Sequence, residues 1–137
     1  RESLRFQKNE RMSVLKNKSI LIVESDDAIL NILSSRLKKR EMIVITATDG
    51  YDGYIRACTE SPDFMIIDDL LPSINGYRLS RLLKFDARYK DIPILLISTT
   101  PENGNSPHQV KTGIDKLLYK PFRFSALISA LESIGEK

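Results

Sequence analysis

The chain has 137 residues, 42% of them hydrophobic and 28% charged, which is the composition of an ordinary globular domain and excludes a disordered or collagen-like protein. Its apolar runs, such as 20–23 and 94–97, are far shorter than the roughly 20 residues of a membrane span, and its one cysteine, Cys58, cannot close an internal disulfide, so we expect a cytoplasmic protein without membrane contact. The net charge of +3 does not indicate a basic surface on the body of the chain, because residues 19–137 carry 15 Lys or Arg and 16 Asp or Glu. We therefore expect no direct nucleic-acid binding.

The first 18 residues form a basic leader. They carry six Lys or Arg residues and two Glu residues, without the apolar stretch of a signal peptide. We interpret residues 1–18 as a solvated linker or the remnant of a tag, and residues 19–137 as one folded domain.

From residue 19 onward, short apolar runs alternate with segments of helical periodicity. Strands are predicted over 19–24, 43–47, 63–68, 92–98 and 116–119. Helices are predicted over 27–40, 51–60, 77–85 and 122–134, with Leu79, Leu82 and Leu83 of the third facing the core. Prolines and glycines leave room for only a short helix over 107–111. This alternation predicts βαβ units and a parallel sheet with helices around it.

Polar side chains follow the strands at the points where the strands end. They are Glu24, Ser25, Asp26, Asp68, Asp69, Ser98 and Lys120. In a parallel sheet these ends share one edge, so carboxylates, a hydroxyl and an amine are expected to meet there. Carboxylate oxygens suit Mg²⁺, and a lysine suits a phosphoryl group or its acceptor carboxylate. Without a glycine-rich phosphate loop, the set favours a phosphoryl group on a carboxylate over a bound nucleotide or flavin.

Four motifs carry a resemblance to a known family. They are "ILIVESDD", "PDFMIIDDLLPSINGYRL", "IPILLIS" and "YKPF", in this order and at the family's spacing. Residues 19–134 resemble the receiver domain of two-component response regulators. The resemblance implies a flavodoxin-like, doubly wound (βα)5 fold with a five-stranded parallel sheet in the order 2-1-3-4-5.

The resemblance also implies roles in phosphorelay signal transduction, as an acceptor rather than an enzyme. Asp68 would accept a phosphoryl group as a nucleophilic carboxylate. Lys120 would pair with Asp68 and then with a phosphoryl oxygen, and the Ser98 hydroxyl would bind another oxygen. The Lys120–Pro121 peptide bond is often cis in this family.

Mg²⁺ is the cofactor that the resemblance implies. Its ligands would be Glu24, Asp68 and the backbone carbonyl of Leu70. The family normally has a second acidic residue where this chain has Ser25, and Asp26, one position on, is the alternative ligand. Asp26 is also suited to cap the following helix, as is Asp27.

One further departure from the family concerns the switch, because Leu117 stands where an aromatic residue is usual. Asp69 follows the acceptor at a position where an apolar residue is commoner, and it adds negative charge. Two hypotheses therefore remain open: a phosphorylatable receiver, and a degenerate receiver that acts as a phosphorylation-independent interaction module.

The expected partners are proteins. A histidine kinase or phosphotransfer protein would donate the phosphoryl group, and an output domain, a protein partner or a second copy of the chain would respond. We expect the output surface on 107–111, the fifth strand and the last helix, with Leu117, Tyr119, Arg123 and Phe124.

Overall fold

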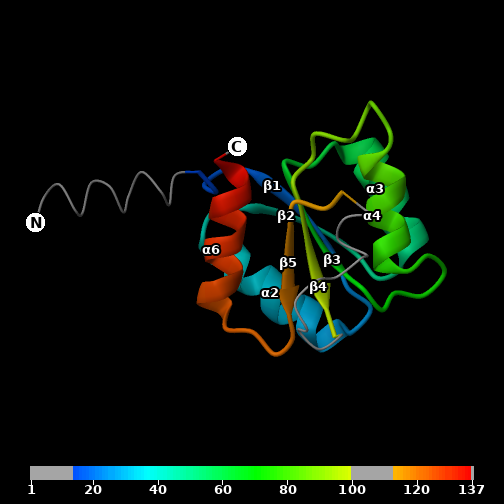
Figure 1. The fold of residues 1–137 in the computed structure, drawn as a ribbon. Helices are drawn as coiled ribbons and strands as arrows, with labels where there is room; N and C mark the ends of the chain where they lie inside the picture. The colour runs from blue at the N-terminus through cyan, green and yellow to red at the C-terminus, as the bar shows by residue number, and fades with distance from the viewer. Residues whose placement is uncertain (1–13, 100–112, 137) are drawn as a thin grey trace, which may run out of the picture.

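The computed structural model describes residues 14–99 and 113–136, which form a three-layer α/β domain (Figure 1). Five parallel strands make one sheet in the order β2-β1-β3-β4-β5. The strands are β1 (Ser19–Val23), β2 (Ile43–Ala47), β3 (Phe64–Asp68), β4 (Ile94–Ser98) and β5 (Lys116–Tyr119). The fold class and the strand order predicted from the sequence are confirmed.

Helices cover both faces of the sheet. They are α2 (Asp27–Lys39), α3 (Gly50–Glu60), α4 (Gly76–Lys84) and α6 (Phe124–Gly135). Figure 1 shows α2 and α6 on one face, with α3 and α4 on the other. The predicted elements agree with these to within two residues at each end, and the predicted helix over 107–111 lies outside the described residues.

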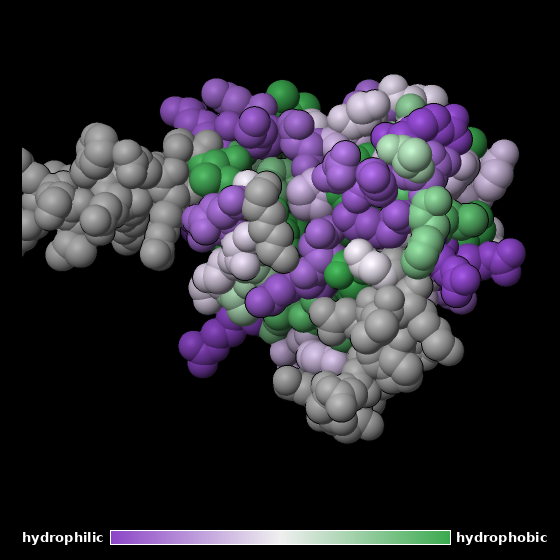
Figure 2. All heavy atoms as spheres, turned by 45° about the horizontal axis from the view of Figure 1, so that its top comes forward, coloured by the Kyte–Doolittle hydropathy of each residue, from purple (hydrophilic) through white to green (hydrophobic). Residues whose placement is uncertain are grey.

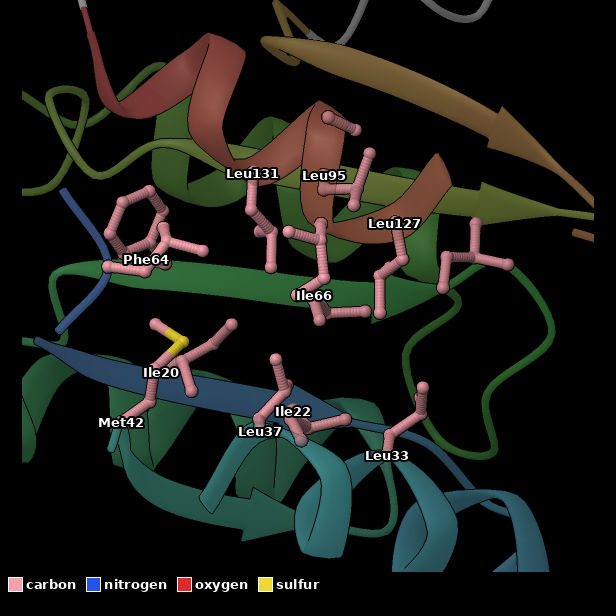
Figure 3. Close-up of a cluster of buried hydrophobic side chains, with 14 of the residues drawn as sticks. Ile20, Ile22, Leu33, Leu37, Met42, Phe64, Ile66, Leu95, Leu127 and Leu131 are labelled. Carbon is pink, nitrogen blue, oxygen red and sulfur yellow. The ribbon is translucent and has the colours of Figure 1, made fainter. Parts of the chain in front are cut away.

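The core is divided between the two faces because successive strand residues point to opposite sides. In β1, Ile20 and Ile22 pack toward α2 and α6, whereas Leu21 and Val23 pack toward α3 and α4. Figure 3 shows the first of these clusters, with Leu37 and other α2 and α6 side chains meeting the sheet. The continuous apolar character of β1, β3 and β4 thus reflects burial on both faces.

The basic leader is partly included in this core. Leu15 is 2% exposed and belongs to the cluster beneath α2 and α6. The backbone N–H of Asn17 donates to the carbonyl of Glu41. The division of the chain into 1–18 and 19–137 stays a prediction.

One predicted core position is wrong. Leu79 and Leu83 of α4 are fully buried, but Leu82 is 43% exposed. Leu79 and Leu83 are four residues apart and share one face, whereas one residue turns a helix by about 100°, which places Leu82 on the flank of that face. Cys58 is half-buried and is a free thiol.

The side of the molecular surface that Figure 2 brings forward is mainly hydrophilic, with separate hydrophobic areas. Within residues 14–99 and 113–136, no helix is both long and apolar enough to cross a membrane.

Candidate functional site

The parallel register brings the carboxyl ends of the strands to one edge of the sheet. Val23 pairs with Ala47 and with Ile67, Asp68 pairs with Ile97, and Ser98 pairs with Tyr119. The polar residues that follow these positions therefore gather at that edge, as the sequence predicts.

Asp68 and Lys120 form the centre of the site. Lys120 Nζ lies 2.6 Å from Asp68 Oδ1 and 3.8 Å from Glu24 Oε1. Asp68 and Glu24 are each 4% exposed. Lys120 follows β5, and its peptide bond to Pro121 is cis, as the resemblance implies. The structure thus brings together three predicted site residues from three strands.

The two carboxylates are not fully balanced by one lysine. Burial raises the pKa of Asp68 above its ordinary value, Lys120 opposes this, and the negative charge of Asp69 adds to it. Burial also raises the pKa of Glu24, against a backbone hydrogen bond from Asp26 and with a further contribution from Asp68. Burial disfavours the charged form of Lys120, but its hydrogen bond and charge interaction with Asp68 prevail and raise its pKa. The pocket therefore carries excess negative charge, which a bound cation would balance.

Local backbone contacts fix the position of Asp68. The N–H of Leu70 donates to Asp68 Oδ2 at 3.2 Å. Gly76 begins α4 directly against the Asp68 carbonyl, and a Cβ at this position would collide with that oxygen. Asn75 caps α4 by accepting from the Arg78 N–H at 2.9 Å. The "PSING" turn therefore packs closely because a glycine follows the cap.

The residues after β1 have different surroundings. Glu24 Oε2 accepts from the Asp26 N–H at 3.1 Å. The Asp26 carboxylate caps α2 by accepting from the N–H groups of Ala28 and Ile29 at 2.9 and 3.1 Å. Ser25 is exposed. Of the two capping candidates, Asp26 is the one that takes the cap.

Ser98 makes contacts that the sequence did not predict. Its Oγ donates to Asp69 Oδ2 at 3.2 Å and lies 3.1 Å from the Tyr77 hydroxyl. For Asp69, the sequence indicates only an added negative charge and not the contact with Ser98. The register supplies the missing signal, because Asp68 pairs with Ile97 and the next positions on the two strands are Asp69 and Ser98.

The donor set matches Mg²⁺ in kind. Within the described part of the chain, no group of three or more His, Cys, Asp or Glu side chains is arranged to hold a metal. Mg²⁺, however, usually takes one or two carboxylates together with waters and phosphate oxygens. The buried, incompletely balanced pair Glu24 and Asp68 fits that requirement.

Residues 20–132 match the family model of the response regulator receiver domain. The chain belongs to this family. It is 31% identical over 106 residues to the alkaline phosphatase synthesis transcriptional regulatory protein PhoP of Bacillus subtilis, covering 77% of this chain and 43% of that protein. It is 33% identical over 118 residues to the transcriptional regulatory protein CusR of Escherichia coli K12, covering 84% and 50%. The chain thus spans about half the length of these relatives.

A solved structure shows the same fold. The receiver domain of a sensor histidine kinase from Pseudomonas aeruginosa PAO1, described with a magnesium ion coordinated in its active site cleft, aligns with a TM-score of 0.79 at 21% identity, covering 88% of this chain and 99% of that chain. This likeness supports the fold alone.

Family membership establishes the broad function. The chain is a receiver domain of phosphorelay signalling, and the alternative of a phosphorylation-independent module is not favoured. Receiver domains are signalling domains rather than enzymes in the ordinary sense. The family binds Mg²⁺ in its active site and interacts with histidine kinases and output domains.

Proposed function

We propose that this receiver domain accepts a phosphoryl group on Asp68. The observation that carries the proposal is the buried Asp68 carboxylate with Lys120 Nζ at 2.6 Å, at the carboxyl edge of a parallel sheet. A buried carboxylate held beside a lysine has a nucleophilic oxygen and a neighbouring positive charge for the group that it receives.

The transfer breaks one bond to phosphorus and forms another. An Asp68 carboxylate oxygen bonds to the phosphorus while the bond from phosphorus to the donor's imidazole nitrogen, or to the leaving oxygen of a small donor, breaks. The leaving group keeps that electron pair, and no oxidation or reduction occurs. Lys120 lies within reach of both states, first against Asp68 and then against a phosphoryl oxygen.

Mg²⁺ would be held by Glu24, Asp68 and the backbone carbonyl of Leu70. When bound, it would neutralise charge on the transferred phosphoryl group. The excess of negative charge around Lys120 supports this assignment. Asp26 is a weaker candidate, because its carboxylate already accepts two backbone hydrogen bonds at the start of α2. Ser25 offers a hydroxyl where the family usually has a carboxylate.

The phosphodonor would be a histidine kinase or phosphotransfer protein that docks beside Lys120. A groove of about 680 Å³ lies between α2 and the segment after β5, and its lining includes Ile29, Ile32, Arg36, Lys120 and Phe124. Ile32 is 57% exposed, whereas Leu30, Leu33 and Leu37 of α2 are buried in the core. An apolar groove that reaches Lys120, beside the proposed acceptor Asp68, suits a helical donor protein.

The acceptor assignment is tested by intact-mass measurement. Acetyl phosphate or phosphoramidate with Mg²⁺ should add one phosphoryl group to the wild type and none to Asp68→Asn. Asp63→Asn, at the opposite end of β3, is the matched control and should be labelled like the wild type. Equal labelling of Asp68→Asn and the wild type would overturn the proposal, and peptide mapping to Asp69 would move the acceptor by one residue.

A further inference from the structure

A third buried carboxylate, which follows the proposed acceptor in the sequence, accepts hydrogen bonds from the end of β4. Asp69 is 4% exposed. Its Oδ2 atom accepts hydrogen bonds from Ser98 Oγ at 3.2 Å, from the Thr99 N–H at 3.1 Å and from Thr99 Oγ1 at 3.2 Å. Its Oδ1 atom is buried without a hydrogen-bond partner among the described residues. Within residues 14–99 and 113–136, the hydrogen bonds to this carboxylate thus come from Ser98, the last residue of β4, and from Thr99, which follows it.

The Ser98 hydroxyl has one proton to donate. Because that proton goes to Asp69, the Tyr77 hydroxyl, 3.1 Å from Ser98 Oγ, is the donor in the second contact. The result is a line of hydrogen bonds from Tyr77 on α4, through Ser98 on β4, to Asp69 after β3. Ser98 is fully buried, so its hydrogen bonds are not open to exchange with bulk water.

We propose that Asp69 is a positioning residue that competes with the phosphoryl group for the Ser98 proton. This inference rests on the proposed function of Asp68. Before transfer, Asp69 holds the hydroxyl, and phosphorylation must exchange this hydrogen bond for one to a phosphoryl oxygen. Asp69 therefore opposes the activated arrangement and sets how readily it forms.

The chemistry of the acceptor supports a competitor rather than a simple structural link. A hydrogen bond to a charged acceptor is about twice as strong as one between neutral groups, so the Asp69 carboxylate retains the Ser98 proton better than an amide would.

The hydrogen bonds from Tyr77 to Ser98 and from Ser98 to Asp69 also indicate which elements respond when the Ser98 proton changes its acceptor. Ser98 is joined to α4 through Tyr77, and Leu117 on β5 has no hydroxyl with which to make a comparable contact. Loss of the Asp69 bond would change the position of Ser98 and thereby the contact that α4 makes with β4.

The experiment is a double-mutant cycle of Asp69→Asn and Ser98→Ala, with Asp63→Asn as the matched control. Asp63 makes the same kind of bond at the other end of the sheet, where its Oδ2 accepts from the Ser19 N–H and hydroxyl. The rate of acyl-phosphate formation with phosphoramidate and Mg²⁺ is measured by intact mass. We expect Asp69→Asn to accelerate labelling about tenfold when Ser98 is present and about twofold at most in the Ser98→Ala background. Asp63→Asn should leave the rate unchanged.

Equal acceleration in both backgrounds would overturn the proposal, because Asp69 would then act through its charge alone. A slower or unchanged rate in Asp69→Asn would also overturn it. Amide exchange at Thr99, followed by NMR without metal or phosphodonor, gives an independent readout of the hydrogen bonds. We expect exchange about threefold to tenfold faster in Asp69→Asn, since an amide is the weaker acceptor.

The two measurements separate this inference from the function on which it rests. If no variant is labelled, the acceptor assignment of Asp68 fails, and Thr99 exchange still decides whether Asp69 holds the end of β4. Faster exchange in Asp69→Asn supports that hold, and unchanged exchange refutes it.

Discussion

Lys120 Nζ lies 2.6 Å from Asp68 Oδ1, yet the pKa of Asp68 remains above its ordinary value because burial, together with the negative charge of Asp69, outweighs the lysine. The ion pair therefore does not fully offset the cost of burying the ionised Asp68 carboxylate. A carboxylate whose charged form is disfavoured in this way is typical of a site that binds a cation and a phosphoryl group.

This relationship has a consequence for the pH dependence of stability. Between the ordinary pKa of Asp68 and its raised pKa in the folded protein, the native state binds more protons than the unfolded state, so stability falls as pH rises through that interval. At about pH 7 the full penalty remains, and we expect Asp68→Asn to be more stable than the wild type, because asparagine, like the protonated carboxyl, carries no charge. The gain should shrink as pH falls through the raised pKa of Asp68.

Urea unfolding in EDTA at several pH values measures this difference. Asp91→Asn, which changes an exposed aspartate before β4, is the control and should show no such gain. A Asp68→Asn variant that is less stable than the wild type at neutral pH would show that Lys120 stabilises the ionised carboxylate more than burial disfavours it.

A partly buried ion pair at the opposite edge of the sheet is held by further hydrogen bonds. Lys84 Nζ lies 2.6 Å from Asp115 Oδ2 and donates to the carbonyls of Lys90 and Ile92, while Asp115 Oδ2 accepts from the Ile94 N–H. The Lys84 side chain is 8% exposed. Asp115→Ala leaves this ammonium without its counter-charge, and we expect a loss of about 2 kcal/mol, less than for a fully buried pair because Asp115 is partly exposed.

Chemical denaturation and the labelling rate together test this role. Asp86→Ala, which breaks the pair with the exposed Arg88 side chain, should change stability less than Asp115→Ala does. Because the Lys84 pair lies at the far edge of the sheet from Asp68, labelling of folded Asp115→Ala should match that of the wild type. A stability change no larger than that of Asp86→Ala would contradict the assignment.

The sequence predicted most of the fold because its signals are local and repeated. Runs such as "ILIV" and "FMIID" are buried on both faces of a parallel sheet, and such strands read as continuous apolar segments. The convergence of Glu24, Asp68 and Lys120 followed from the rule that parallel strands end at one edge.

The parts that escaped prediction depend on side-chain direction. Position alone could not decide between capping and metal binding for Asp26, because both uses need a carboxylate at the same place. Leu82 satisfied the spacing of an apolar face but lies on its flank. The hold of Asp69 on Ser98 required the register of β3 against β4, which no local pattern specifies.

Of the output surface predicted from the sequence, the structure describes β5 and α6. Leu117 and Tyr119 on β5 and Phe124 at the start of α6 are half-buried, and Arg123 is exposed. We expect amide exchange of β5 and α6 to change when beryllofluoride and Mg²⁺ are added, measured against Mg²⁺ alone and against Asp68→Asn. Changes confined to α3, with none in β5 or α6, would refute this placement.

The docking groove predicts a difference between protein and small-molecule donors. Ile32→Glu places a charge in the apolar groove beside Lys120, whereas Ile43→Glu makes the same change at a similarly exposed position on β2, with exposed fractions of 57% and 60%. With any phosphohistidine protein that labels the wild type, we expect Ile32→Glu to slow transfer about tenfold, which corresponds to about 1.4 kcal/mol. Ile43→Glu should transfer at the wild-type rate.

Acetyl phosphate provides the internal comparison for that experiment. It needs no docking surface, so both variants should accept its phosphoryl group at the wild-type rate. Slower labelling of Ile32→Glu by acetyl phosphate would indicate damage to the Asp68 site itself rather than to a docking surface.

At Ser25 this chain lacks a negative charge that the family usually places near the metal. Asp68 and Glu24 are the two buried carboxylates at Lys120, and Ser25 stands exposed at the place where the family usually has another acidic residue. One unit charge at about 4 Å contributes around 1 kcal/mol in bulk water and more in a partly buried pocket. A factor of ten in affinity corresponds to about 1.4 kcal/mol, so we expect Ser25→Asp to bind Mg²⁺ at least about fivefold more tightly than the wild type.

Titration of Mg²⁺ into wild type, Ser25→Asp and Ser25→Asn separates charge from size, because only Ser25→Asp adds a carboxylate. Asp26→Asn completes the set: asparagine caps a helix as well as aspartate does, so the stability of α2 is kept while one charge is removed. We expect Asp26→Asn to bind Mg²⁺ about as the wild type does, since the Asp26 carboxylate is engaged by Ala28 and Ile29. A clear loss of affinity in that variant would make Asp26 a ligand, and equal affinities of wild type and Ser25→Asp would show that the serine is no handicap.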